Sequence, residues 1–427
     1  MTAIFPSVRG LLTGGRRGRH AGAVPSRSAS VPALLALLLI AGTAFSVVFL
    51  GPFDLSPLTS FLGGGGDDVT RGEWVRDPSL RPYYTNSTCA FIEDYQNCMK
   101  HGRPSLEFLH WRWRPARGDL PRFDAARFFT LLHGKSVLFV GDSLASSHVR
   151  SLVCTLSQVA PAPATMESLP GGFERWAFPA HDVSVSFFWT PFQVRWRLTR
   201  GPAKAVGPDR QGEVFAGPTD LHLDEPDARW IAAVPNHDVV ILSASHWFAR
   251  PAIYYRAVGC HQAACDGDNN NNLTAMKPWQ AQREAFRTVL QTLAGMEGFK
   301  GTMILRTVAP THYENGGWFD GGECTATEPA TDPDEDPAEM AEPEAEFYKA
   351  QVEEFRAAEA EPARRTGVRM RLMDVTGMML RRPDGHPDRY GHGPGQHEGF
   401  DIDCLHWCLP GPIDVWNELL MKILTDS

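Results

Sequence analysis

The stretch KSVLFVGDS, residues 135–143, combines a strand signal with a serine at its end. Its first six residues form a short apolar run with β-branched and aromatic side chains, which predicts a buried strand. Gly141 permits a sharp turn, and a helical pattern then continues to Leu156. Because active sites in parallel sheets gather at the carboxyl ends of strands, Ser143 is a candidate nucleophile. Amides beside Gly141 and Asp142, at the start of the helix, are candidate oxyanion donors. The alternative is that Ser143 only caps the helix.

The same strand signal recurs along the chain and alternates with helical patterns. Three further buried strands are predicted at DVVILSAS (238–245), GTMILRTV (301–308) and VRMRLMDV (368–375). Amphipathic helices are predicted at 278–296, 340–359 and 412–424. Strands that alternate with helices favour an α/β fold, in which helices cover both faces of a parallel central sheet.

The stretch DIDCLHWCLPG, residues 401–411, predicts the partners of that serine. Asp403 and His406 are spaced so that the carboxylate reaches one ring nitrogen while the other nitrogen faces a hydroxyl. A serine nucleophile needs such a base, and the base needs such an orienting acceptor. The alternative is a helix-capping loop in which the histidine is structural.

The same stretch also permits a metal site, because Cys404, His406 and Cys408 alternate like ligands. Zinc sites usually contain a second pair of ligands, and no second cluster accompanies these residues. We therefore expect no metal here. At RRPDGHPDRYGH (381–392) we expect a hydrogen-bonded loop rather than a metal site.

The N-terminal region predicts a membrane anchor. Residues 31–50, VPALLALLLIAGTAFSVVFL, carry no charge and are about as long as the ~20 residues that cross a bilayer as a helix. Arginines precede this span and only Asp54 follows it closely, so the positive-inside rule predicts a luminal body. A cleaved signal peptide, whose apolar core is usually about 7–15 residues, is the alternative. The expected divisions are a cytosolic tail (1–30), a signal anchor (31–50), a flexible stem (51–70), a loop-rich luminal segment (71–125) and the main domain (126–427).

The cysteines and the charge agree with a luminal body. All eight cysteines follow the apolar span, and an even number in an oxidising compartment predicts disulfides; they are Cys89, Cys98, Cys154, Cys260, Cys265, Cys324, Cys404 and Cys408. Asn86 and Asn272 begin Asn-x-Ser/Thr sequons and are predicted glycosylation sites. The net charge of -9 argues against a nucleic-acid partner. Trp407, next to His406, is predicted to contact substrate because an indole face suits a sugar ring.

Several motifs together resemble the plant trichome-birefringence-like proteins, which are Golgi polysaccharide O-acetyltransferases. The motifs are GEWVRD (72–77), HGRPSLEFLHWRWRP (101–115), LPRFD (120–124), VLFVGDS (137–143) and DCLHWCLPGPIDVWNELL (403–420), and the resemblance covers residues 72–425. It implies a three-layer α/β/α domain of the SGNH/GDSL type. It also implies Ser143 as nucleophile, with Asp403 and His406 completing a triad.

The resemblance implies substrates and disulfides as well. HWFARPAIYYRAVGC (246–260) and RLMDVTGMMLRRPDGHPDRYGH (371–392) are similar to the branch that acts on xyloglucan or mannan. Family analogy makes acetyl-CoA the acetyl donor, with no bound cofactor. By family pattern Cys89 pairs with Cys154, Cys260 pairs with Cys265, and Cys98 and Cys324 each pair with one of Cys404 and Cys408.

This chain departs from the family pattern at three places. The family usually has cysteines where this chain has Asp67 and Gly118, and losing both is coherent if they form one disulfide. The family also commonly has Arg-Asn three and four residues after the serine, where this chain has Ser146 and Ser147. If those family side chains bind substrate or the oxyanion, their loss changes activity or specificity.

These observations predict a single-pass type II enzyme of the Golgi membrane, anchored through residues 31–50. The enzyme transfers acetyl groups to a cell-wall hemicellulose through an acetyl-serine, with the side-chain galactose of xyloglucan favoured over mannan or xylan. Two alternatives stay open. An acetyl esterase of the same fold would use water in place of the sugar hydroxyl. A non-catalytic polysaccharide-binding protein would carry the triad without using it.

Overall fold

The structure is a computed structural model that describes residues 68–160, 166–198, 218–256, 259–260, 276–317, 321–331, 336–361, 367–393 and 402–426. The chain divides into two compact units, Met1–Gly66 and Asp67–Ser427, and every described residue belongs to the second. The predicted tail and anchor, and nearly all of the predicted stem, lie outside the described residues. Within the described ranges, no helix is long and apolar enough to cross a membrane.

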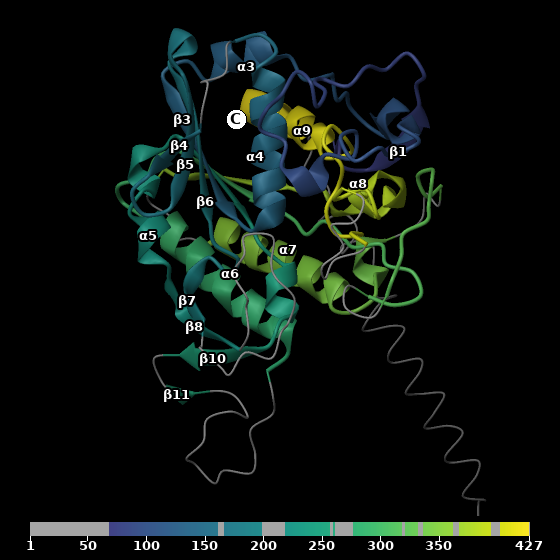
Figure 1. The fold of residues 1–427 in the computed structure, drawn as a ribbon. Coiled ribbons are helices and arrows are strands. Elements are labelled where there is room, and N and C mark those ends of the chain that lie inside the picture. The colour runs from purple at the N-terminus through teal and green to yellow at the C-terminus, as the bar shows by residue number, and fades with distance from the viewer. Residues whose placement is uncertain are drawn as a thin grey trace, which may run out of the picture. The chain divides into compact units, whose positions relative to one another are not determined.

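A seven-stranded mixed sheet lies at the centre of this unit (Figure 1). In spatial order its strands are β13 (Arg369–Met373), β12 (Thr302–Arg306), β9 (Val239–Ser243), β3 (Lys135–Gly141), β6 (Val183–Trp189), β5 (Phe173–Phe178) and β4 (Glu167–Leu169). The strands from β13 to β6 run parallel, and β5 and β4 continue the sheet antiparallel. The four predicted strands are confirmed as β3, β9, β12 and β13. The predicted parallel central sheet is confirmed from β13 to β6, and it does not extend to the edge that β5 and β4 form, where the pairing is antiparallel.

Helices cover both faces of this sheet. The α-helices are α3 (Ala125–Leu131), α4 (Ser143–Leu156), α5 (Ala228–Ile231), α6 (Pro278–Ala294), α7 (Glu344–Ala360), α8 (Thr376–Leu380) and α9 (Asp414–Thr425). The 3-10 helices are η1 (Asp94–Gln96), η2 (Glu107–His110), η3 (Pro179–His181), η4 (Val234–Asn236), η5 (His246–Ala249), η6 (Pro337–Glu339) and η7 (Pro383–Gly385). The predicted helices at 278–296, 340–359 and 412–424 are confirmed as α6, α7 and α9, and the helical pattern that continues to Leu156 is confirmed as α4.

The residues of β3 show how the sheet separates two apolar cores. Val137 and Phe139 face a core shared with α3, α4 and α9, whereas Leu138 and Val140 face a core shared with α6 and α7. This alternation follows from the two-residue repeat of a strand, whose successive side chains point to opposite faces. Figure 1 shows α4 close to α9, and α6 close to α7. The arrangement therefore has the three layers that the sequence predicts.

The described residues form two smaller sheets beside the central one. One contains β11 (Gly259–Cys260), β10 (Ala252–Arg256), β8 (Thr219–Pro226) and β7 (Val194–Leu198) in that order. The other pairs β1 (Gly72–Arg76) with β2 (Trp111–Pro115) in antiparallel fashion. The predicted loop-rich segment 71–125 thus contains a sheet of its own. It belongs to the same compact unit as the main domain.

Gly141 sets how closely β3 approaches β9. It lies opposite Ser243 in the parallel register, and a Cβ added at this position would collide with the backbone oxygen of Ser243 and with the side chain of Ala145. Neither neighbour is a flexible side-chain end, so one of the two elements must move. Glycine is therefore required for packing at the point where β3 leads into α4.

We expect Gly141→Ala to destabilise the protein by about 1–3 kcal/mol, because overpacking forces backbone shifts of that cost. Urea denaturation of the purified variant measures this change in the free energy of unfolding. Gly377→Ala is the matched control, since its added Cβ would lie 3.5 Å from the Pro337 side chain, an ordinary contact. Equal stability of the two variants would contradict the close-approach argument.

Candidate active site

Ser143 is the first residue of α4 and lies directly after β3. The helix begins there because Asp142 is its N-cap, with Oδ1 accepting a 3.0 Å hydrogen bond from the Leu144 amide. Asp142 Oδ2 accepts a 3.4 Å bond from the Ser245 amide after β9. A helix N-terminus carries partial positive charge, which favours an oxyanion at this position. Both oxygens of Asp142 accept backbone hydrogen bonds, so its side chain serves the helix start rather than an oxyanion.

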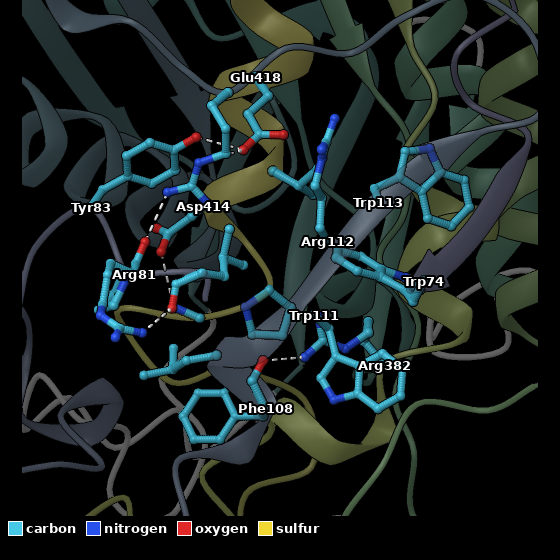
Figure 2. A pocket seen from close by; sticks show the side chains of 17 residues that line it. Trp74, Arg81, Tyr83, Phe108, Trp111, Arg112, Trp113, Arg382, Asp414 and Glu418 are labelled. Atoms are coloured by element: carbon cyan, nitrogen blue, oxygen red, sulfur yellow. Dashed lines mark hydrogen bonds and ion pairs between the residues drawn. The ribbon is translucent and has the colours of Figure 1, made fainter. Parts of the chain in front are cut away.

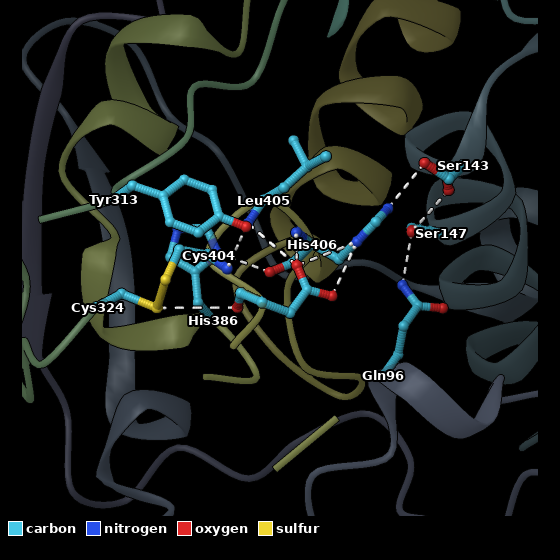
Figure 3. Close-up of polar contacts among 10 residues, drawn as sticks. Gln96, Ser143, Ser147, Tyr313, Cys324, His386, Cys404, Leu405 and His406 are labelled. Carbon is cyan, nitrogen blue, oxygen red and sulfur yellow. Dashed lines mark hydrogen bonds and ion pairs between the residues drawn. A yellow bond between two sulfur atoms is a disulfide. The ribbon is translucent and has the colours of Figure 1, made fainter. Parts of the chain in front are cut away.

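The folded chain brings His406 to this serine, as Figure 3 shows, and places Asp403 on the other side of the His406 ring. His406 Nε2 lies 2.8 Å from Ser143 Oγ, and His406 Nδ1 lies 2.9 Å from Asp403 Oδ2. Asp403 is 1% exposed and His406 5% exposed, whereas Ser143 is partly exposed. The hydroxyl is thus accessible while the groups behind it are shielded from water. These contacts have the geometry that the sequence predicted for a nucleophile, a base and an orienting carboxylate.

Backbone contacts within the loop fix the carboxylate. Asp403 Oδ1 accepts hydrogen bonds from the amides of Leu405 (3.1 Å) and His406 (3.0 Å). The carboxylate therefore binds both the imidazole ring and the backbone of the same histidine. Its remaining orientations are limited, which places the histidine ring before any substrate arrives.

Two disulfides hold this loop to the rest of the protein. Cys404 pairs with Cys324, and Cys408 pairs with Cys98, so each of the two loop cysteines is bonded to a different segment. These pairings agree with the family pattern, which left the choice of partners open. Because Cys404 and Cys408 are oxidised, neither is available as a zinc ligand. Within the described part of the chain, no group of three or more His, Cys, Asp or Glu side chains is arranged to hold a metal ion.

The other predicted modification sites have different outcomes. Cys89 pairs with Cys154, as the family pattern implies. Cys265 and Asn272 lie outside the described residues, so neither the Cys260–Cys265 pairing nor the second glycosylation site is tested. Asn86 is exposed, in a turn that a glycan can reach.

The prediction that Trp407 contacts substrate is wrong for this structure. Its side chain is fully buried, and its Nε1 donates a 3.1 Å hydrogen bond to the carbonyl oxygen of Arg382. Its ring packs against that of His386, with centroids 4.5 Å apart. Trp407 is therefore part of the core behind residues 403–408, the loop that carries Asp403 and His406 and that is called the catalytic loop below. Adjacency to His406 in sequence was misleading, because neighbouring loop residues point in different directions.

Ser146 and Ser147, which replace the family Arg-Asn, contact residues 71–125, which are called the N-terminal segment below. Ser147 Oγ donates to the carbonyl oxygen of Ser143 (2.9 Å) and accepts from Gln96 Nε2 (2.5 Å), as Figure 3 shows. Ser146 Oγ lies 3.5 Å from Glu93 Oε1. Both serines are buried, so their side chains stabilise the start of α4 through the segment before it.

Sequence reasoning missed two residues that adjoin the triad, Gln96 and Tyr95. Gln96 is fully buried and binds Ser147, which lies one helical turn after Ser143 in α4. The Tyr95 ring lies edge-on to the His406 ring, with the ring centroids 4.9 Å apart. Both belong to η1, a short turn whose sequence has no periodicity and no chemical motif. Only the tertiary fold assigns them to the site.

A buried cation interacts with Asp142, the residue before Ser143. Arg306 ends β12, is 2% exposed, and places its guanidinium 4.3 Å from the centre of the Trp416 ring. Burial lowers the pKa of Arg306 to about 10, while the charge of Asp142 raises it. The group therefore stays charged at neutral pH. It adds a fixed positive charge on the α4 side of the sheet, at its carboxyl edge.

A separate cleft lies between the N-terminal segment and α9 (Figure 2). It encloses about 450 Å³ of space, part of it open to solvent, and its lining includes Trp74, Trp111, Arg112 and Glu418 but none of the triad. Glu418 is buried at its side, where Oε1 accepts a 2.5 Å hydrogen bond from the Tyr83 hydroxyl. Burial raises the pKa of Glu418 to about 7.

The site and the fold together define a class of protein. A serine, a histidine and an aspartate bonded in series at the carboxyl edge of an α/β sheet are typical of enzymes that transfer or hydrolyse acyl groups. Comparison with known families agrees with this class. Residues 120–423 match PC-Esterase, the GDSL/SGNH-like acyl-esterase family found in Pmr5 and Cas1p. Residues 67–119 match the PMR5 N-terminal domain.

Similar proteins cover most of the chain. Protein trichome birefringence-like 19 of Arabidopsis thaliana is 41% identical over 364 residues, which span 84% of this chain and 80% of that protein. Xyloglucan O-acetyltransferase 1 of Arabidopsis thaliana is 38% identical over 365 residues, with 84% and 80% covered. Xyloglucan O-acetyltransferase 4 of Populus trichocarpa is 39% identical over 359 residues, again with 84% and 80% covered. The chain belongs to the trichome-birefringence-like group of the PC-Esterase family, and the resemblance drawn from its motifs is confirmed.

Removing each of two disulfides of similar span tests whether the Cys324–Cys404 bond affects catalysis in addition to stability. Removing Cys324–Cys404 or Cys89–Cys154 by paired Cys→Ser changes opens loops of 80 and 65 residues, and chain entropy predicts a loss of about 4 kcal/mol in each case. Only the first pair contains a neighbour of Asp403. We therefore expect similar drops in Tm, but a kcat for an activated acetyl ester at least tenfold lower in the first variant alone. Equal kcat values would show that this disulfide does not position the loop.

Glu418 is expected to make stability depend on pH. Its folded-state pKa of about 7 exceeds the unfolded value of 4.5, so the folded protein binds more protons between these values and loses stability as pH rises through them. The shift corresponds to a loss on the order of 3 kcal/mol. Urea denaturation at pH 5 and pH 8 should show Glu418→Gln gaining stability over the wild type at the higher pH. Glu107→Gln, at an exposed position, serves as the control and should show no such gain.

Proposed function

We propose that this protein is an O-acetyltransferase that acetylates a plant cell-wall hemicellulose through an acetyl-enzyme on Ser143. The observation that carries the proposal is the series of contacts from Asp403 through His406 to the Ser143 hydroxyl. The xyloglucan O-acetyltransferases that align over most of the chain support the choice of polysaccharide as acceptor. Among hemicelluloses the side-chain galactose of xyloglucan is favoured, and mannan and xylan are the alternatives.

The contacts support a two-step transfer. In the first step His406 Nε2 takes the proton of Ser143 Oγ as that oxygen attacks the acetyl carbonyl carbon of the donor. The imidazolium then gives the proton to the leaving group, and the acetyl group remains on Ser143. In the second step His406 takes the proton of a sugar hydroxyl, whose oxygen attacks the acetyl carbon. Ser143 Oγ leaves and regains the proton, so the enzyme returns to its starting state.

Asp403 stabilises the positive ring that forms in each step. It is buried beside His406 Nδ1 and holds that nitrogen as a donor, which leaves Nε2 free to accept the serine proton. The negative charge that develops on the acetyl oxygen needs donors of its own. Because the Leu144 amide already bonds to Asp142, we assign the oxyanion to other amides at the start of α4, that of Ser143 among them.

The donor and the location are extensions of the same proposal. Acetyl-CoA is the proposed donor, by analogy with the family. We place the enzyme in the Golgi membrane as a type II protein anchored by residues 31–50, with its catalytic unit in the lumen. Three disulfides among the described residues and an exposed sequon at Asn86 support an oxidising compartment, where disulfides persist.

Hydrolysis of an acetyl ester is the second candidate function, and the description of the matched family is the observation that supports it. The matched family is described as one of acyl-esterases, and water can enter in the second step with the same triad. The ratio of acetylated sugar to free acetate, measured with an acceptor present, separates the two functions.

The test is incubation of the purified protein with acetyl-CoA and with xyloglucan, mannan or xylan oligomers. We expect an added acetyl group on Ser143 by intact-protein and peptide mass spectrometry, followed by its transfer to xyloglucan. Ser143→Ala should abolish both products, and Asp403→Asn should lower kcat by about 10⁴, the loss seen when the histidine is held in the wrong tautomer. Transfer by Ser143→Ala at the wild-type rate would reject the mechanism.

A further inference from the structure

Behind the catalytic loop, two histidines form a chain that ends on the backbone of His406. His386 Nδ1 lies 2.6 Å from the carbonyl oxygen of His406, and His386 Nε2 lies 2.7 Å from His312 Nδ1. His312 Nε2 in turn lies 2.8 Å from the carbonyl oxygen of Leu380. His386 is buried and His312 is partly buried. Figure 3 shows His386 on the side of the loop away from Ser143.

The number of protons needed for these contacts exceeds what two neutral rings carry. A carbonyl oxygen only accepts, so His386 Nδ1 and His312 Nε2 must each bear a hydrogen. A neutral imidazole has one such hydrogen, and both rings have then used theirs. The two nitrogens that face each other at 2.7 Å would both present lone pairs, which repel. A third proton between them turns the repulsion into an N–H···N hydrogen bond.

The surroundings of the pair both favour and oppose an added charge. The Trp407 ring packs on His386 and can stabilise a cation through its π face. The charges of Asp403 and Asp384 raise the pKa of His386 and His312 respectively. Burial acts in the opposite direction on both rings and lowers the pKa of His312 to about 4. The charged and titratable side chains that act on the pair are His312 and Arg103, which lower the pKa of His386, Asp403, which raises it, and Asp384, which raises the pKa of His312.

We propose that His386, with His312 behind it, is a positioning residue for His406 and that in acid solution the two rings share a third proton between their facing nitrogens. The pair fixes the backbone of the residue whose ring serves as base. Its functional meaning rests on the proposed acyl transfer, whereas the shared proton can be measured without activity. Nothing in the motif RRPDGHPDRYGH indicated this role, because the partner, His312, lies 74 residues away.

Loss of the third proton opens one of the three contacts. If His386 keeps its proton on Nδ1, His312 must donate from Nδ1, and its bare Nε2 then faces Leu380. If His312 keeps its proton on Nε2, His386 must donate from Nε2, and the anchor on the His406 carbonyl is lost. The neutral pair is therefore a mixture, and only part of it holds the catalytic loop. Because burial lowers both pKa values, this change occurs below the ordinary histidine value of about 6.5.

Three variants of the full-length protein test the positioning role. His386→Phe removes the anchor and should lower kcat about 10- to 100-fold with KM nearly unchanged, because small displacements of a catalytic group are costly. His386→Asn places an amide N–H near the lost Nδ1 and should restore most of that kcat. His237→Phe is the control, because His237 Nδ1 also lies 2.9 Å from a carbonyl oxygen, that of Ala233. His237 precedes β9, so it lies at the amino ends of the parallel strands, away from Ser143. Equal kcat in His386→Phe and His237→Phe would overturn the proposal.

A fourth variant tests the shared proton. In His312→Asn the amide N–H can donate to His386 Nε2, so a neutral His386 keeps its proton on Nδ1 at every pH. The ratio of the kcat of His312→Asn to the wild-type kcat should rise between pH 4.5 and 6.5. The rise is about twofold if the neutral wild-type pair carries its proton on His386 Nδ1 in half of the molecules. A ratio independent of pH would overturn the shared proton.

Nitrogen-15 NMR of the histidine side chains gives a readout that needs no turnover. We expect a histidinium signal that titrates below pH 6.5 in the wild type and in Ser143→Ala, and that is absent from both His312→Asn and His386→Asn. A pair that keeps two protons down to pH 4 would overturn the proposal. If Ser143→Ala still transfers acetyl groups while this signal is present, the proposed mechanism fails and the proton-sharing pair stands.

Discussion

The contact between Ser143 Oγ and His406 Nε2 joins residues 263 positions apart in the chain. Both residues are positioned for this contact by the elements around them. The serine is fixed from one side by β3, by the close approach at Gly141 and by the Asp142 cap. The histidine is fixed from the other side by Asp403, by two disulfides and by α9, which begins soon after it. A contact of such long range cannot form until the sheet has assembled, so catalysis depends on global folding rather than on a local motif.

The main elements of this fold were predictable because their signals are local. The strand at 135–141 is a continuous apolar run, and the helix at 278–294 has an apolar face with helical spacing. The triad was predictable for a related reason. Each half, Gly-Asp-Ser and Asp-x-x-His, is a short motif that follows or precedes such an element, and the family pattern joined the two halves.

The parts that were missed have no local signal. The strands β4 and β5 pair antiparallel beyond β6, and their edge position permits mixed sequences without a continuous apolar run. Gln96 and Tyr95 reach the site from an irregular turn, and Trp407 turns into the core although its neighbour faces the serine. In each case the direction of a side chain depends on tertiary packing, which neither spacing nor composition reports.

The Cys98–Cys408 bond has a consequence for how this architecture can vary in evolution. The two matched families meet between residues 119 and 120, yet the N-terminal one supplies Cys98 for one of the two disulfides of the catalytic loop, and Gln96, whose side-chain amide binds Ser147. A border between sequence families is therefore not a border between independent modules. Recombination that exchanged one part alone would change the partners of Cys408 and Ser147, so the two parts are expected to be inherited together.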